Sequence, residues 1–279
     1  MKLHTIDTGF FKLDGGAMFG VVPKTIWNKT NPADNNNLCT WAMRCLLVED
    51  GGRLILIDTG IGNKQDAKFL SHYYLHGDAT LDSSLAALGF HRDDITDVFL
   101  THLHFDHVGG AVVRDGEKLL PTFRNARYWS NPKHWDWATN PNDREKASFL
   151  KENILPIQES GQLQLIDAQD GINFAEGFDI RFVSGHTEAM MLPLINYKGK
   201  KILYMADLLP SVGHLPLPYV MAYDMFPLTT LKEKKLFLTE ALEQDYVLYF
   251  EHDPVNECCT LQQTEKGIRV RDTFKLSEI

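Results

Sequence analysis

The 279-residue chain has little of what marks several common protein classes, beginning with cysteine. It contains only Cys39, Cys45, Cys258 and Cys259, whose spacing is unlike that of a zinc ribbon. Because the neighbours Cys258 and Cys259 cannot readily bridge to each other, we expect all four thiols to be reduced. Their expected role is that of small apolar residues, which is common in cytosolic proteins.

Long apolar runs and an excess of basic residues are also missing. Residues 1–7 lack the continuous apolar stretch of a signal peptide, and no later segment approaches a membrane span. We therefore expect a cytoplasmic protein with no membrane partner. Lysine and arginine number 28 against 37 acidic residues, a formal net charge of −9, which argues against a nucleic-acid partner because phosphate binding needs clustered cations.

The composition is nevertheless that of a well-packed protein. Apolar residues make up 44% of the chain, which suffices for a full core. No low-complexity linker interrupts the sequence, so we expect a single domain over residues 1–279. A Trp-rich stretch begins a helical insert around residues 131–154, which could form one wall of a pocket. Alternatively, Trp135 and Trp137 anchor this insert to the core.

Apolar patterns predict an α/β chain in which two sets of strands are each followed by helices. An Asp-Gly turn signal joins the strands 41–49 and 53–57 into a hairpin. The glycine-rich segment 13–20 is expected to be a loop in which Met18 and Phe19 look exposed; it either forms a lip over the substrate or merely packs on the barrel edge. The other predicted strands are 3–8, 95–100, 126–129, 180–183, 192–197, 201–205 and 246–250, and the predicted helices are 64–76, 81–88 and 230–244, the last with a capping box of Thr230 and Glu233.

The most informative stretch is residues 101–110, Thr-His-Leu-His-Phe-Asp-His-Val-Gly-Gly. Four potential ligands so close together would repel one another or lack partners without a cation, so the pattern H-x-H-x-D-H indicates a metal site. His102 and His104 lie just beyond a predicted buried strand. Asp106 and His107 return towards the same point and supply ligands for a second ion. The glycine pair behind them would let a helix start tightly.

Three further potential ligands, His186, Asp207 and His252, each directly follow a predicted strand. Strand ends on one edge of a sandwich converge, so these side chains are expected to meet the first motif. Each alone would be a weak signal, since an isolated histidine is more often structural. In this order after H-x-H-x-D-H, they make the sequence resemble the metallo-β-lactamase superfamily over essentially its full length.

The resemblance implies a metallo-β-lactamase-like αββα sandwich, with two β-sheets covered by helices, and a dinuclear metal site. Zinc is the expected metal, although manganese, iron or cobalt suit the same donors. The implied ligands are His102, His104 and His186 for the first ion, Asp106, His107 and His252 for the second, and Asp207 as the bridge between them.

Details of the site separate branches of the superfamily. Asp207 stands where the dizinc β-lactamases have cysteine, and His104 stands where the flavodiiron proteins have glutamate, which argues against reduction of oxygen or nitric oxide. The sequence is most similar to the N-acyl homoserine lactonases of the YtnP-like quorum-quenching group, on segments 13–24, 102–106, 205–207 and 220–224. It departs from the best-studied lactonase pattern, which has a tyrosine shortly after the bridging aspartate, and Tyr223 or His214 could replace that tyrosine.

The implied function is hydrolysis of small lactones by a hydrolase with two metal ions. Asp106 would carry the proton from the attacking water to the leaving alkoxide. Asp58 either orients a ligand histidine or closes its own turn. Met18, Phe19 and Phe105 would favour a partly apolar acyl substrate.

Other readings stay open. The same site could hydrolyse a phosphotriester or a thioester, and a metal-stabilised binding protein without chemistry is the alternative of another class. Loop aromatics such as Phe19 and Trp27, if exposed, could serve a homodimer contact.

Overall fold

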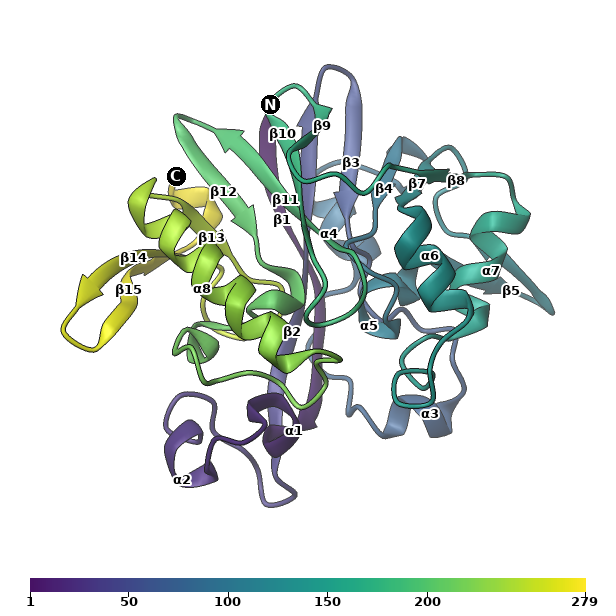
Figure 1. Ribbon diagram of the computed structural model, residues 1–279. Coiled ribbons are helices and arrows are strands. Elements are labelled where there is room, and N and C mark those ends of the chain that lie inside the picture. Colours follow the sequence, from purple (N-terminus) through teal and green to yellow (C-terminus); the bar gives the residue numbers. More distant parts are fainter. The chain divides into compact units, whose positions relative to one another are not determined.

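The computed structural model describes residues 1–279 and divides them into two compact units (Figure 1). Unit 1 comprises Met1–Gly9 and Met43–Ala168, and unit 2 comprises Phe10–Ala42 and Gln169–Ile279. The organisation as a single domain with a helical insert stays a prediction. No helix combines the length and the apolar composition needed to cross a membrane.

A six-stranded sheet organises unit 1. β2 and β3 form the predicted antiparallel hairpin, whereas β3, β4, β7 and β8 are parallel neighbours. Parallel strands end on the same edge of a sheet, so the segments that follow β3 and β4 emerge side by side. In sheet order, the strands are β1 (Lys2–Asp14), β2 (Leu38–Asp50), β3 (Arg53–Ile57), β4 (Asp97–Phe99), β7 (Arg127–Ser130) and β8 (Leu163–Leu165).

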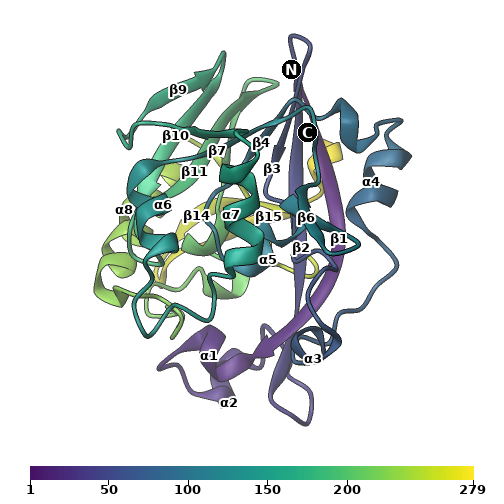
Figure 2. The same cartoon turned by 90° about the vertical axis from the view of Figure 1, so that its right-hand side faces the viewer.

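Short helices and a small hairpin complete unit 1. α7 packs against the hairpin of β5 and β6 (Figure 2). Trp135 belongs to the buried core cluster and Trp137 packs against that cluster, so their anchoring role is confirmed. The remaining elements are α3 (Ala67–Ser71), α4 (Leu81–Ala87), η1 (Arg92–Asp94), α5 (Phe105–Val108), η2 (Gly109–Ala111), β5 (Val112–Asp115), β6 (Lys118–Pro121), α6 (Pro132–Thr139) and α7 (Lys151–Glu159).

Unit 2 is built on a seven-stranded sheet. Its neighbours are antiparallel except β12 and β13, which are parallel and are connected through α8 (Pro227–Glu243). α8 packs against β14 and β15 (Figure 1). In sheet order, the strands are β15 (Gly267–Phe274), β14 (Cys258–Thr264), β13 (Val247–Tyr249), β12 (Lys200–Tyr204), β11 (Met190–Tyr197), β10 (Phe178–Val183) and β9 (Ile172–Ala175); the short helices are α1 (Gly15–Phe19), α2 (Lys24–Trp27), η3 (Ala206–Leu208), η4 (Val212–His214) and η5 (Leu276–Glu278).

The prediction that residues 13–20 form a loop with Met18 and Phe19 exposed is wrong. β1 continues to Asp14, whose carboxylate caps the short helix α1 by accepting a 2.8 Å hydrogen bond from Ala17 N. Met18, Phe19 and Trp27 are all buried, and the rings of Phe19 and Trp27 stack 5.2 Å apart. Neither aromatic side chain is therefore exposed for a homodimer contact.

Two predicted helices differ from the observed ones. Only Ala67–Ser71 of the expected helix 64–76 is helical. α8 begins at Pro227, so Thr230 lies inside the helix and the proposed capping box is wrong. Glu233 instead accepts hydrogen bonds from Ser184 N and Gly185 N, at 2.8 and 3.0 Å. These long-range partners outweigh the local cap.

The four cysteines are free and buried. Cys258 and Cys259 lie on β14, and burial raises the pKa of the Cys259 thiol above its usual range. The burial of all four agrees with their expected role as small apolar residues.

Candidate metal centre

The part of the site that belongs to unit 1 lies at the sheet edge where β3 and β4 end. Asp58 follows β3 with a left-handed φ of 57°. Its carboxylate accepts hydrogen bonds from Thr101 N at 2.8 Å and from the Thr101 hydroxyl at 2.6 Å, and it lies 3.2 Å from His107 Nδ1. One buried carboxylate thus fixes both the start of the histidine motif and one of its rings, which confirms the expected contact of Asp58 with a motif histidine.

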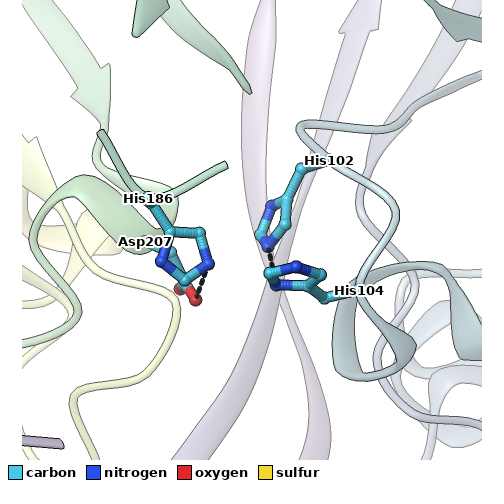
Figure 3. A group of neighbouring side chains, drawn as sticks. All are labelled: His102, His104, His186 and Asp207. Atoms are coloured by element: carbon cyan, nitrogen blue, oxygen red, sulfur yellow. Dashed lines mark hydrogen bonds and ion pairs between the residues drawn. The ribbon is translucent and has the colours of Figure 1, made fainter. Parts of the chain in front are cut away.

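The first two histidines of the motif face each other. His102 Nε2 lies 3.1 Å from His104 Nδ1 (Figure 3). The other ring nitrogens have protein partners: His102 Nδ1 lies 3.1 Å from the Thr101 hydroxyl, and His104 Nε2 lies 3.0 Å from Glu145 Oε1. Each ring is held on its far side, and its inner nitrogen is directed at the neighbouring ring.

Glu145 is a site residue that sequence reasoning missed. Its other carboxylate oxygen accepts hydrogen bonds from Trp137 Nε1 at 2.6 Å and from Asn142 Nδ2 at 3.2 Å. The side chain is 1% exposed, and it comes from the segment between α6 and α7. The segment contains a second acidic residue, Asp143, so only the tertiary contact with His104 distinguishes Glu145.

The second half of the motif forms α5. His107 Nε2 lies 3.8 Å from Asp106 Oδ2, and both side chains are buried. α5 starts before the glycine pair, whereas the short 3-10 helix η2 begins at Gly109. The glycine pair permits close packing: a Cβ on Gly109 would collide with the backbone of Ile61, and one on Gly110 with the backbone of Thr59.

Unit 2 collects its own donors around Asp207, which follows β12. One oxygen of Asp207 lies 3.1 Å from His186 Nε2, and the other lies 3.0 Å from His252 Nε2 (Figure 3 shows the His186 contact). His186 Nδ1 lies 2.8 Å from Asp224 Oδ1, and His252 Nδ1 lies 2.8 Å from the carbonyl oxygen of Ala42. Here too, the far side of each ring is held by the protein.

The electrostatics of this group favour a cation. Burial alone would lower the pKa of His186, but the carboxylates of Asp207 and Asp224 raise it to about 10. Positive charge is therefore stabilised beside these carboxylates. Buried imidazole nitrogens and carboxylate oxygens are donors that zinc and other first-row divalent metals accept. The residues present in each unit fit such an ion.

Phe105 packs against two other aromatic residues of unit 1. It is 8% exposed, and its ring centroid lies 5.4 Å from that of Phe69 and 4.7 Å from that of Tyr73. Phe69 lies on α3, and Tyr73 follows it. Sequence reasoning missed both residues, although their i, i+4 spacing inside a predicted helix was a usable signal.

The other expected substrate contacts lie in unit 2. Met18, Phe19 and His214 form one buried group, in which the rings of Phe19 and His214 stack 4.3 Å apart. Burial lowers the pKa of His214 to about 3, so this imidazole is neutral. Tyr223 is 38% exposed. A contact of any of these residues with a substrate stays a prediction.

Comparison with known proteins yields one family and several solved structures. The model of the metallo-beta-lactamase superfamily matches residues 44–252. A probable metal-dependent hydrolase from Staphylococcus aureus is 28% identical, with a TM-score of 0.89 over 98% of this chain and 96% of that one. No curated protein matches the sequence.

More distant structures share the fold. AidC, a dizinc quorum-quenching lactonase in complex with a product, is 22% identical, with a TM-score of 0.80 over 98% of this chain and 95% of that one. A mutant of AiiA from B. thuringiensis with N-decanoyl-L-homoserine bound at its active site is 20% identical, with a TM-score of 0.69 over 91% of this chain and 93% of that one.

Proposed function

Because the chain belongs to the metallo-β-lactamase superfamily, we propose that this hydrolase opens lactone rings, N-acyl homoserine lactones foremost, and so acts in quorum quenching. The fold class expected from the sequence, with mixed sheets and helices, is confirmed. The hydrolase assignment agrees with the metal-dependent hydrolase and the lactonase among the similar structures. The lactone as substrate is our inference.

The proposed centre keeps the ligand set that the sequence predicts. The matched range, residues 44–252, includes every member of the set. Zinc is the proposed metal, in line with the dizinc lactonase of the same fold. The proposed ligands are His102, His104 and His186 for one ion, Asp106, His107 and His252 for the other, and Asp207 for both.

One observation carries this proposal: all five imidazoles are pre-oriented. In each ring, one nitrogen is held by a carboxylate, a hydroxyl or a backbone carbonyl, and the other is directed at another member of the set. Such outer partners fix the tautomer and orientation of metal-binding histidines and raise their basicity. A merely structural histidine cluster does not require this arrangement in five rings at once.

Bound divalent ions would supply a hydroxide nucleophile at neutral pH and polarise the ester carbonyl. The protein's own part is proton transfer by Asp106. Its carboxylate is 3.8 Å from His107 Nε2 and buried, so it is held near the donors without a short contact to that ring. It would accept the proton of the attacking water and deliver it to the ring oxygen as the ester C–O bond breaks.

The acyl chain would lie on the aromatic wall formed by Phe69, Tyr73 and Phe105. Burying apolar area contributes about 25 cal/mol per Å², so longer acyl chains should bind more tightly there. The net charge of −9 disfavours anionic substrates and agrees with a neutral lactone. Met18, Phe19, Tyr223 and His214 remain proposed contributors from unit 2.

The test is a hydrolysis screen on protein whose metal content has been measured. We expect N-acyl homoserine lactones to be opened, with one proton released per turnover and a preference for longer acyl chains. Phe69→Ala should weaken the chain-length preference and leave hydrolysis of an unsubstituted lactone nearly unchanged; Phe174→Ala in unit 2 is the matched control.

Other outcomes would redirect the proposal. If a phosphotriester or a thioester is turned over rapidly and no lactone is opened, the proposed substrate class is wrong, and the assignment as a hydrolase stands. A similar structure named as the hydrolase AbOPH, 22% identical, makes such substrates worth including. Inactivity of the metal-loaded protein on every ester would favour a metal-stabilised binding protein.

A further inference from the structure

A lysine occupies the buried face of α8. Lys234 is 1% exposed, and the other buried residues of the helix are Thr230, Phe237, Leu238 and Ala241. An ammonium group at such a position costs free energy unless it is paired or fully hydrogen-bonded. No carboxylate lies within ion-pair distance of Lys234, so its compensation must come from neutral acceptors.

Those acceptors are backbone carbonyls of one short segment, residues 214–219. The Lys234 ammonium donates to the carbonyl oxygens of His214 at 2.7 Å and Tyr219 at 2.8 Å. It lies farther from those of Pro216 and Leu217, at 3.2 and 3.4 Å. Since an ammonium has three donors, the two longer contacts share one. We call this arrangement the carbonyl cage.

Residues 214–222, which include the carbonyls around Lys234, in turn contact α1. The neutral ring of His214 donates from Nε2 to the Met18 carbonyl at 2.9 Å, and its Nδ1 accepts from the Ser211 hydroxyl at 2.9 Å. The same ring stacks on Phe19. Further along, Ala222 N donates to the Ala17 carbonyl at 2.8 Å. The cage, His214 and α1 therefore form one connected set of contacts.

The segment lies in the sequence between Asp207, a proposed ligand, and Asp224, which holds the ligand His186. Asp224 contacts His186 Nδ1, and Met225 N donates to the His186 carbonyl at 3.0 Å. The partly exposed Tyr223 is part of the same stretch. We call residues 208–226 the cage loop. Its conformation determines where the unit 2 groups proposed to contact substrate lie.

We propose that Lys234 is a positioning residue that orders the cage loop and α1 and thereby sets substrate affinity. The proposal rests on the proposed lactone hydrolysis. Lys234 acts through the loop and does not touch substrate. The proton carrier Asp106 belongs to unit 1, so the chemical step should be insensitive to Lys234 and KM should respond.

The experiment compares three variants of the metal-loaded full chain. Lys234→Met keeps the length of the side chain without donors, Lys234→Gln keeps two N–H donors, and Lys235→Met makes the same change at an exposed neighbour. Hydrogen exchange is followed by mass spectrometry in peptides from the cage loop and α1, with β4 peptides as the internal reference. KM and kcat for a long-chain N-acyl homoserine lactone are measured alongside.

For Lys234→Met we expect exchange in the cage loop and α1 to quicken by about tenfold, since each lost hydrogen bond contributes about 1 kcal/mol net. KM should rise by a similar factor, with kcat within about twofold. Lys234→Gln should show a smaller change, and Lys235→Met none. Unchanged exchange in the cage loop, or a fall in kcat at constant KM, would overturn the proposal, as would faster exchange throughout the chain.

A wild-type measurement covers the case in which the Lys234 variants do not fold. Burial lowers the pKa of Lys234 to about 7, so at pH 6 the caged ammonium is protonated and shielded from water. Lys64 is the other buried lysine, so we expect a resolved ¹H–¹⁵N signal from a slowly exchanging ammonium that both Lys64→Met and Lys235→Met retain. Its absence would contradict the cage. If no lactone is turned over, the exchange data still decide whether the cage exists, so the two proposals fail separately.

Discussion

The two units hold their histidines by different means. Unit 1 uses side-chain carboxylates for two of its three rings: Asp58 holds His107, and Glu145 holds His104, while the Thr101 hydroxyl meets His102. In unit 2, a carboxylate holds only His186, whereas the far nitrogen of His252 meets the backbone carbonyl of Ala42. Carboxylate partners raise the basicity of a ligand ring more than neutral acceptors do. The metal affinity of the unit 1 histidines should therefore depend more on partner side chains, which a mutation can remove, than that of the unit 2 histidines.

Each unit also buries one charged side chain among a different kind of partner. Unit 1 buries Asp97, which accepts hydrogen bonds from Arg53 Nε at 3.0 Å, from the Thr96 hydroxyl at 2.7 Å and from Trp129 Nε1 at 2.8 Å. Unit 2 buries the ammonium of Lys234, which donates hydrogen bonds to backbone carbonyl oxygens. Acid should weaken the anchoring of Asp97, because protonation removes its charge, while leaving the ammonium charged.

The largest effect is expected from the proton carrier of unit 1. Asp106→Asn should lower kcat by about 10²-fold or more, because general acid–base catalysis contributes that much. The paired variant Asp224→Asn, in unit 2, removes no proton carrier and should lower kcat far less once metal is saturating. Steady-state kinetics with measured metal content checks both. Near-normal turnover of Asp106→Asn with its metal retained would remove Asp106 from the mechanism.

Removal of an anchoring carboxylate should have an intermediate effect. Glu145→Gln should weaken metal binding by about 10- to 100-fold, as is typical for such outer partners. Competition against a chromophoric chelator measures the affinity. Asp143→Asn is the matched control, since that side chain belongs to the same insert and is 99% exposed. Equal affinities of the two variants would show that the contact of Glu145 with His104 does not support the site.

The smallest effect concerns the pH dependence of stability. Burial raises the pKa of Asp97, but its hydrogen bonds to Arg53, Thr96 and Trp129 outweigh burial and hold it below the usual value. The unfolded state therefore binds the proton more readily, so the stabilisation is complete above the unfolded pKa of about 4 and is lost as pH falls through the folded pKa.

Asp97→Asn should accordingly reduce the free energy of unfolding by about 1–3 kcal/mol at pH 7. The difference from wild type should shrink at about pH 3, below the unfolded pKa. Urea unfolding at both pH values measures it, with the exposed Asp143→Asn as control. A difference that stays constant with pH would mean that the charge of Asp97 contributes nothing.

The sequence predicted those parts of the molecule whose cause is local. The spacing of His102, His104 and Asp106 is itself a metal-binding pattern, and the hairpin of β2 and β3 follows from its Asp-Gly turn. Exposure of Phe19 was predicted wrongly because its burial depends on stacking between Trp27 and His214, and His214 is distant in the sequence.

The residues that were missed act through tertiary contacts. In the sequence, nothing distinguishes Glu145 from its acidic neighbour Asp143; the contact with His104 does. Lys234 looks like any helix-surface lysine until the carbonyls of residues 214–219 surround it. Thr230 and Glu233 matched a capping box, yet the amides of residues 184 and 185 are the partners of Glu233. Local patterns cannot rank such competing contacts.

The most direct test of the account is the metal content of the chain. Protein produced with zinc and purified without chelator should contain two metal ions per chain by elemental analysis, because the histidines of both units are pre-oriented as ligands. Asp207→Ala, which removes the proposed bridge, should reduce that content. A wild-type value that stays near one after metal supplementation would contradict the dinuclear centre.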